Sequence, residues 1–199
     1  MPDINTQAFW DSMDAGMWDD VSGLAIQIVL AGIEGGSTAL PDDAQPFINF
    51  DDLYNKVLEF ARKYRLDWIR NITEVTRKKT IKAIGDWIRS GSPLSTLEQV
   101  LEPLFGEMRA KRIATTEVTR LFAHGNQMAW EATGFVNSMK WMTAEDEKVC
   151  PICKPLDGTL IGIGDLDALP PAHVNCRCWV QPVVDDDAFS RKLDEILGL

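Results

Sequence analysis

The chain has 199 residues, of which 45% are hydrophobic and 25% charged, so it has enough apolar material for one substantial core and is not typical of a disordered protein. Its formal net charge of -10 argues against a protein that coats nucleic acid through a general positive field, because such binding comes from neutralising phosphates. Any binding through basic side chains is therefore confined to a local part of the chain.

The N-terminal quarter is acidic. Residues 1–50 contain eight acidic side chains and no Lys or Arg, and the first basic residue is Lys56. A secretory signal needs a positively charged start, and the apolar run at residues 21–33 is too short to span a bilayer. We interpret that run as a buried helix of a protein made in the cytoplasm.

Hydrophobic spacing predicts a mostly helical chain before Gly134. Residues 9–34 have apolar side chains at three- and four-residue steps, which predicts an acidic helical arm, and residues 35–49 form a linker. The same spacing over residues 51–89 predicts one long helix or two in near-continuation. Ser95 followed by Glu98 is typical of a capping box that starts a short helix. A third helix is expected from about residue 108 to 133, with Gly134 as its stop.

The chain changes character after Gly134. Residues 135–142, 158–161 and 178–184 are candidate strands separated by turns rich in Pro, Gly and Asp, and an amphipathic helix is expected after the acidic residues 185–187. The predicted fold class is therefore α+β, mainly α, with a helical domain and a small C-terminal β-rich Cys/His knuckle of the zinc type. The predicted division is an acidic arm and linker at 1–48, a central domain at 49–182 with helices at 51–133 and the knuckle at 135–182, and an acidic, amphipathic tail at 183–199.

The clearest chemical signal lies between residues 150 and 178, where all four cysteines are found. In a reducing cytosol such a cluster indicates metal ligation rather than disulfides. Two residues between ligands let a tight turn aim both donors at one ion, and Cys with His suits tetrahedral zinc. We therefore predict a structural zinc site with five candidates for four positions: Cys150, Cys153, His173, Cys176 and Cys178.

The choice among the five stays open at this stage. The preferred set repeats the two-residue spacing in both halves and leaves Cys178 as the spare: Cys150, Cys153, His173 and Cys176. An all-cysteine site is a real alternative. Buried free thiols or an adventitious disulfide are the simpler interpretation of the same residues.

Catalysis is the competing functional prediction. A catalytic zinc keeps an open position and a carboxylate beside its bound water. Asp146, Glu147 and His124 are the candidates for that role, so a metal-dependent hydrolase or nuclease is the alternative function. Neither histidine has the H-x-E spacing of the zinc deaminases, and the predicted ligands can fill the coordination shell of the zinc. We therefore expect that the protein is not an enzyme.

The order of several further motifs resembles a known family. On the predicted third helix these are Arg109-Ala110, Ile113-Ala114, Thr116-Glu117 and Gly125; after it come Trp141, Asp146, the two cysteines of the CxxC pair, Leu156-Asp157-Gly158, Pro170-Pro171 and residues 173–178. In this order they resemble the phage Mu F-like head morphogenesis (minor capsid) family, over roughly residues 50–182 and most specifically from Arg109 onward. The chain departs from the family pattern at Thr115, where relatives often carry Arg, and at Val174, where they often carry Pro. Neither position is a candidate metal ligand.

The resemblance implies a minor component of a tailed-phage or prophage procapsid, synthesised in the bacterial cytoplasm and located in the virion or procapsid interior. It implies action in head assembly near the portal, with portal, capsid or scaffold proteins as partners. Contact with packaged DNA is also implied, whereas a membrane association or an established enzymatic activity is not. Residues 49–182 are then the shared domain, with the arm and the tail outside it.

Two smaller features carry structural predictions. Glu117 lies among apolar residues of the third helix, and a buried carboxylate needs a partner. We predict that Glu117 accepts hydrogen bonds from Arg177 or from the backbone of the knuckle and so ties the helix to the metal module; a surface glutamate is the alternative. His124, seven residues further along, is expected to be structural.

Residues 62–82 form the most basic stretch of the chain. The candidate contacts to phosphates or to an acidic partner are Arg70, Arg77, Lys78, Lys79 and Lys82. A solvated helix face is the favoured interpretation, because charge runs on long helices commonly serve as their polar side. A third interpretation is that the acidic arm folds back on this stretch.

Overall fold

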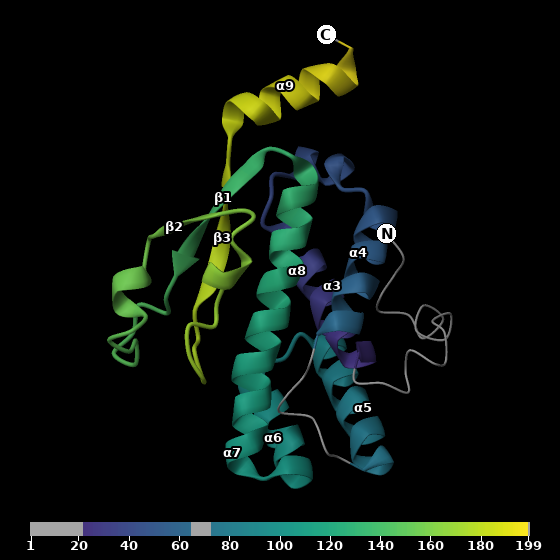
Figure 1. The fold of residues 1–199 in the computed structure, drawn as a ribbon, viewed down its shortest axis with the longest axis vertical. Helices are drawn as coiled ribbons and strands as arrows, with labels where there is room; N and C mark the ends of the chain where they lie inside the picture. The colour runs from purple at the N-terminus through teal and green to yellow at the C-terminus, as the bar shows by residue number, and fades with distance from the viewer. Residues whose placement is uncertain (1–21, 65–72, 199) are drawn as a thin grey trace.

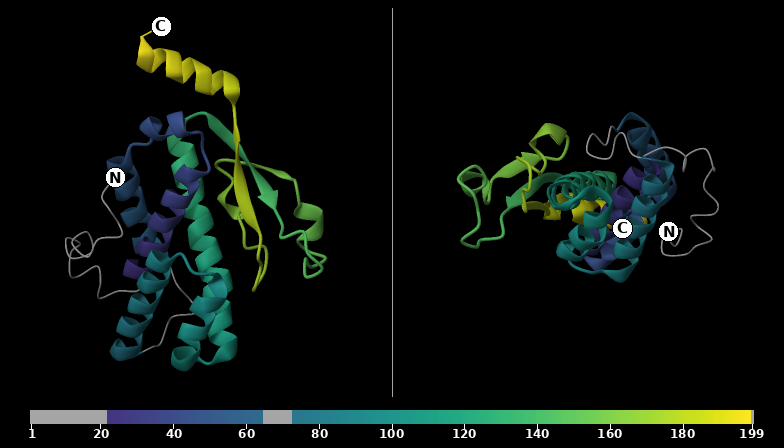
Figure 2. Two further views of the ribbon diagram at one scale, coloured as in Figure 1. Left: turned by 180° about the vertical axis from the view of Figure 1, so that it is seen from behind. Right: turned by 90° about the horizontal axis from the view of Figure 1, so that it is seen from below.

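The computed structural model describes residues 22–64 and 73–198, so the first half of the predicted helical arm at 9–34 and residues 65–72 of the basic stretch lie outside the described residues. A bundle of helices forms the body, and a small sheet with long loops lies along one side of it (Figures 1 and 2). The fold is α+β and mainly α, as predicted. The helices are α3 (Ser22–Thr38), α4 (Phe50–Lys63), α5 (Glu74–Ser90), α6 (Leu94–Phe105), α7 (Glu107–Arg112), α8 (Val118–Thr133) and α9 (Asp186–Leu197).

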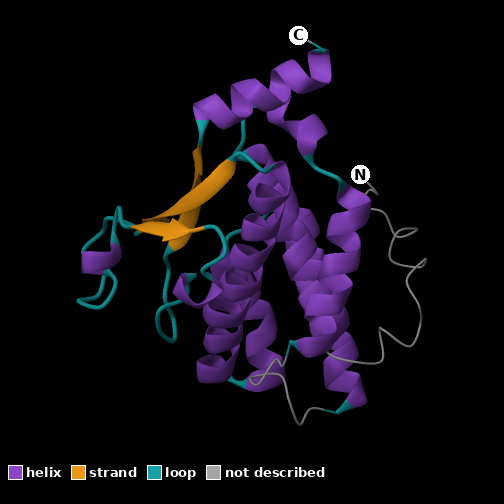
Figure 3. Ribbon diagram, turned by 45° about the horizontal axis from the view of Figure 1, so that its top comes forward, coloured by secondary structure: helices purple, strands orange, loops and turns teal. Residues whose placement is uncertain are grey.

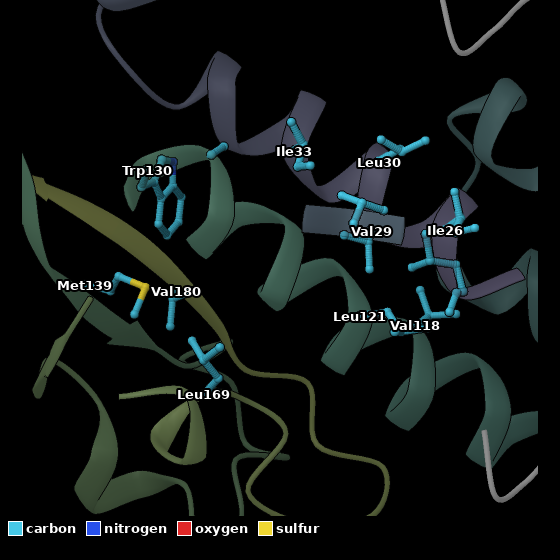
Figure 4. Packing of buried hydrophobic residues seen from close by; sticks show 14 of the residues in the cluster. Ile26, Val29, Leu30, Ile33, Val118, Leu121, Trp130, Met139, Leu169 and Val180 are labelled. Atoms are coloured by element: carbon cyan, nitrogen blue, oxygen red, sulfur yellow. The ribbon is translucent and has the colours of Figure 1, made fainter. Parts of the chain in front are cut away.

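Helix α3 is a central helix of the body rather than part of a peripheral arm. It packs along α8, and every residue from 25 to 30 is buried, so other elements surround the helix on most sides (Figure 4). It also continues through Gly35 to Thr38, where the sequence predicted a linker. The interpretation of residues 21–33 as a buried helix is therefore confirmed for its described part, whereas residues 35–38 belong to this helix and not to the predicted linker.

The two helices α3 and α8 approach each other at glycines. A Cβ atom on Gly125 would overlap the carbonyl oxygen of Val29 and lie 2.8 Å from the Cα atom of Gly32. The indole N–H of Trp130 donates to the carbonyl oxygen of Gly36 over 2.8 Å, which fixes how far one helix can slide along the other. Glycine weakens a helix, but here it allows main-chain contact that no other residue permits.

The middle of the chain follows the predicted helices with two changes. The stretch predicted as one or two helices over residues 51–89 is two, α4 and α5, and Thr73 caps α5 by accepting from the backbone N–H of Thr76 over 3.2 Å. The capping box predicted at Ser95 was wrong, because α6 begins at Leu94 directly after Pro93 and has no side-chain cap. Ser95 is thus already inside the first turn.

The predicted third helix is a continuous helical run of three parts. Helix α7 leads into a π-helical turn, η3 (Ile113–Glu117), which leads into α8. All five residues of η3 are buried. Gly134 ends α8 with φ of 75°, in the left-handed conformation that the sequence predicted.

The sheet has three antiparallel strands in the order β2-β1-β3: β1 (Val136–Met142), β2 (Leu160–Gly162) and β3 (Trp179–Val184). All three lie within a few residues of the predicted strands. Met139 pairs with Ile161 of β2, and Trp141 pairs with Val180 of β3. Met139 and Val180 extend the core on the sheet side of α8 (Figure 4).

Helix α9 follows β3 and leaves the sheet at the end remote from the loops (Figures 1 and 3). Asp185 caps it by accepting from the backbone N–H of Ala188 over 2.9 Å, as the acidic run predicted. The ring of Phe189 packs edge-on against Phe47 and Phe135, with centroid distances of 6.0 and 4.9 Å. The predicted C-terminal helix is therefore anchored to the body at its start. Within the described residues, no helix combines the length and apolar character needed to cross a bilayer.

The helix crossing gives a first prediction. Gly125→Ala places a methyl group against the main chain of α3, so we expect the free energy of unfolding to fall by about 3 kcal/mol or more, as for a severely overpacked core. Gly85→Ala is the matched helical control, because its Cβ atom would meet only the ends of the flexible Gln27 and Arg89 side chains. We expect it to change the stability by less than about 1 kcal/mol. Urea unfolding measures both, and equal losses would contradict the close crossing.

Candidate metal centre

The sheet topology brings the two halves of the cysteine cluster together. The CxxC pair follows β1, and the residues from His173 to Cys178 precede β3. Because β1 and β3 run antiparallel and Met142 pairs with Trp179, the chain leaving β1 and the chain entering β3 lie at the same end of the sheet. Donors more than twenty positions apart in sequence thus become neighbours.

Three of the distances between candidate donor atoms lie close to the edges of a tetrahedral site. The Nε2 atom of His173 is 3.0 Å from Cys150 Sγ and 3.1 Å from Cys153 Sγ, and the Sγ atoms of Cys153 and Cys176 are 3.7 Å apart. Zinc–ligand bonds of about 2.3 Å to S and about 2.0 Å to N give tetrahedral edges of about 3.8 Å for S···S and about 3.5 Å for S···N. The S···S distance matches, and the S···N distances need only a small outward movement of the donors.

All five predicted candidates belong to this centre. They form two overlapping groups of three, Cys150 with Cys153 and His173, and Cys153 with Cys176 and Cys178. Cys153 is common to both groups and is buried. Neither group among the described residues includes a carboxylate, so the donor set consists of soft sulfur and borderline nitrogen, as zinc prefers.

Tight turns hold both halves of the donor set. The backbone N–H of Cys153 donates to the carbonyl oxygen of Cys150 over 3.1 Å, and that of Cys176 donates to the carbonyl oxygen of His173 over 3.2 Å. His173 Nδ1 lies 2.8 Å from the carbonyl oxygen of Val174. A proton on Nδ1 satisfies that contact and leaves the Nε2 lone pair facing the cysteines, which is the arrangement of a metal-bound histidine.

The protein by itself does not favour thiolates at every sulfur. Hydrogen bonding from the backbone N–H of Cys153 lowers the pKa of Cys150 to about 7. Burial raises the pKa of Cys153 and that of Cys178. A bound cation deprotonates such thiols and compensates the buried charge, so the residues fit a metal.

The turn from His173 to Cys178 is hydrogen-bonded to the helical body through Asn175. Its backbone N–H donates to the Thr116 hydroxyl over 3.0 Å, and its Oδ1 atom lies 2.9 Å from the Thr115 hydroxyl. Both threonines belong to the π-helical turn η3 and are buried. Asn175 has φ of 63°, a left-handed conformation that asparagine tolerates better than most residues. The helix and the knuckle are therefore tied together, but by residues that the sequence did not indicate.

The predicted tie between Glu117 and Arg177 was wrong. Glu117 is 2% exposed and accepts from the Tyr64 hydroxyl over 2.7 Å, while Arg120 Nη1 lies 3.4 Å from its other oxygen. Arg177 instead makes a bidentate pair with Asp146 at 2.7 and 2.8 Å. Partners on α4 and one turn along the same helical run satisfy the buried carboxylate, whereas Arg177 stays at the surface. The prediction that Glu117 is buried was correct.

The residues of the hydrolase alternative do not assemble at the cluster. The Arg177 guanidinium holds the pKa of Asp146 at about 2, and Glu147 is exposed and in neither donor group. His124 packs against the ring of Phe60 with a centroid distance of 4.9 Å, and burial lowers its pKa to about 4. His124 is therefore a neutral structural histidine, as the sequence predicted.

The candidate basic residues lie away from the knuckle. Lys78, Lys79 and Lys82 are exposed on α5, on the opposite side of the helical body from the strands (Figures 1 and 2). Lys82 pairs with Asp86 one turn along the helix at 3.0 Å, which is typical of a solvated helix face. Arg70 and the side chain of Arg77 lie outside the described residues, so a contact of this stretch with DNA or a partner stays a prediction.

A groove between the knuckle and the helices is a feature that the sequence did not reveal. Its volume is about 1050 Å³, and its walls come from α3, the junction of α5 and α6, the run from η3 into α8, and residues 176–180. Trp179 is 42% exposed on one wall, and on another wall Asn126 Oδ1 is buried and has no hydrogen-bond partner among the residues that the structure describes. No local sequence pattern predicts this groove, because four segments that are distant in sequence form it.

The Asn175 contacts give a second prediction. Thr116→Val keeps the side-chain shape but removes the acceptor of the Asn175 N–H, so we expect a loss of about 1–3 kcal/mol in stability. Amide hydrogen exchange should accelerate in residues 143–178, as measured by mass spectrometry. Thr119→Val is the control, because no side-chain hydrogen bond is seen for Thr119 among the described residues. If both variants exchange alike, Thr116 does not hold the knuckle.

Comparison with known proteins agrees with the motifs. No curated protein and no solved structure gives a significant match. The family model described as "Phage Mu protein F like protein" matches residues 78–181, slightly more than half of the chain. The matched region includes η3 and all five candidate donors. The chain therefore belongs to the phage Mu protein F-like family, and this membership implies a phage head morphogenesis protein that acts with other capsid components in virion assembly.

Proposed function

We propose that this protein is a minor component of the procapsid of a tailed phage or prophage, that it acts near the portal, and that a structural zinc ion holds its β-rich knuckle against the helical body. Family membership supports the assembly role and favours a structural over an enzymatic one. The observation that carries the metal part is the convergence of four cysteines and one histidine in the matched region, with no carboxylate among them.

The metal acts through folding. Between β1 and β3 the chain has only the short strand β2 and brief helical turns, so it has little regular structure of its own. Its buried apolar residues are also few, and ordering such a segment costs conformational entropy. A closed site rarely exists in the unfolded chain, so the free energy of zinc binding becomes stability of these loops.

Folding of the knuckle also shapes the rest of the surface. Residues 176–180 form one wall of the groove, and Asn175 holds the same turn on η3. The metal therefore maintains a surface as well as a loop. This is how a non-catalytic ion contributes to an assembly protein.

The metal part gives a third prediction. The purified full-length chain should contain one zinc per molecule, and a strong chelator should abolish hydrogen-exchange protection in residues 143–178 while α3 and α8 stay protected. The two helices remain protected because their packing does not depend on the candidate metal ligands. Metal analysis and exchange mass spectrometry measure the two effects.

Variants separate metal loss from other damage to the same loop. Cys150→Ser should reproduce the effect of the chelator without added reagent. Asp146→Asn is the matched control, because it weakens the pair with Arg177 and touches no donor. It should keep both the zinc and the protection. A metal-free chain whose loops are fully protected contradicts a structural zinc.

The assembly part gives a fourth prediction. Procapsids purified from the encoding phage should contain this protein in fewer copies than the major capsid protein, and cross-linking mass spectrometry should join it to the portal protein. Cys150→Ser should reduce its incorporation several-fold, whereas Asp146→Asn should not. A protein cross-linked evenly over the shell, or absent from procapsids, would show that the assignment near the portal is wrong.

A further inference from the structure

Five donors surround a site that takes four, so one cysteine has another role. Cys150, Cys153 and His173 lie within 4.8 Å of one another, so we take these three as the first part of the ligand set. The open question is which residue of the pair Cys176 and Cys178 completes the set. The spacing of the sequence favours Cys176, because HxxC repeats CxxC.

A small cavity at the centre points to Cys178 instead. It has a volume of about 30 Å³, the size of a site for a single water or ion. Four donors line it: Cys150, Cys153, His173 and Cys178. Cys176 is not part of its lining, whereas Cys178 lines both this cavity and the groove.

A buried N–H group, that of the Trp141 indole, lies beside Cys178. Trp141 is 3% exposed, and its indole N–H has no partner within hydrogen-bond distance in the described part of the chain. Burial raises the pKa of Cys178, and the nearby Trp141 indole acts in the opposite direction, which places this indole beside the Cys178 sulfur. A buried N–H without an acceptor costs stability, and a metal-bound thiolate is a better acceptor than a neutral thiol.

The thiol of Cys176 is placed to donate a hydrogen bond. Its Sγ atom is 3.7 Å from that of Cys153, within the range of an S–H···S hydrogen bond, and its side chain is 1% exposed. A neutral thiol here donates to the Cys153 sulfur and brings no additional charge into the buried centre. The 3.7 Å distance thus has an explanation that does not require Cys176 to bind the ion.

We propose that Cys150, Cys153, His173 and Cys178 bind the zinc, and that Cys176 and Trp141 donate hydrogen bonds to its thiolates. Each thiolate then accepts one hydrogen bond. Cys150 accepts from the Cys153 N–H, which is 3.4 Å from its Sγ atom, and Cys153 accepts from the Cys176 thiol. Cys178 accepts from the Trp141 indole. Outer hydrogen bonds of this kind orient ligands and tune affinity. The proposal rests on the zinc site proposed above.

Cobalt substitution of the full-length protein tests the assignment. Cobalt(II) replaces zinc in tetrahedral sites, and the intensity of its thiolate-to-metal charge-transfer absorption rises with the number of bound thiolates. We expect the unsubstituted protein and Cys176→Ser to show three bound thiolates, and Cys178→Ser to show two with an affinity at least about 100-fold weaker. Cys178→His keeps a donor at the position, so it should bind one metal with two thiolates even if Cys178→Ser unfolds.

The hydrogen bonds to the thiolates are tested separately, by the affinity for zinc. Trp141→Phe should weaken zinc binding by about 10–100-fold while the count of three thiolates is unchanged, which is the usual effect of losing an outer hydrogen bond. Trp179→Phe is the control, because its indole is 42% exposed, and it should leave the affinity unchanged. Cys176→Ser retains a hydroxyl donor and should weaken binding by less than about 10-fold.

Two outcomes overturn the assignment. If Cys176→Ser loses a thiolate and Cys178→Ser does not, the ligand is Cys176. If both variants lose one from an initial count of four, the site is all cysteine and His173 is not a ligand. A full-length protein that binds neither zinc nor cobalt(II) defeats the proposed metal site itself, so the two failures are distinguishable.

Discussion

The approach of α3 to α8 at Gly32 and Gly125 sets the spacing on which the rest of the molecule depends. Without side chains between them the two main chains touch, and the apolar residues on both sides of the crossing close into one core. The sheet then packs on the C-terminal half of α8, and α5 and α6 complete the opposite end (Figures 1 and 3). Bulkier residues at the crossing would separate the helices and expose that core to water.

The π-helical turn η3 joins the body to the knuckle. Three consecutive residues, Thr115, Thr116 and Glu117, are all buried, and they make contacts in two directions. The threonines contact Asn175 of the turn from His173 to Cys178, and Glu117 contacts Tyr64 at the end of α4. π-Helical turns widen a helix locally and are frequent at functional sites. Through η3, the position of the turn that carries His173 is coupled to the packing of the body.

The charged residues around the centre find partners by distance and burial rather than by the order of motifs. Asp146 and Arg177 meet at the surface, because the antiparallel strands bring the loops that carry them together. Glu117, enclosed by helices, is satisfied by Tyr64 and Arg120. Neither acid lies in a donor group. The zinc proposed for this centre would therefore organise loops around sulfur and nitrogen donors alone.

The sequence by itself determined the elements and the chemistry of the centre. Hydrophobic spacing identified the helices, turn residues bounded the three strands, and the clustering of Cys and His identified the five candidate ligands that the structure brings together, because these signals are local. The capping box at Ser95 failed because Pro93 moved the helix start by a residue or two.

Only the tertiary structure decided which surfaces and partners meet. The sequence predicted that the helix at residues 21–33 is buried but not that α8 covers it, since spacing shows that a helix has an apolar face and not what packs on that face. The partners of Glu117 and Arg177, the contacts of Asn175 and the groove all join segments far apart in the chain. The choice between Cys176 and Cys178 is of the same kind. Residues two positions apart in sequence are equivalent until the cavity and the Trp141 indole distinguish their surroundings.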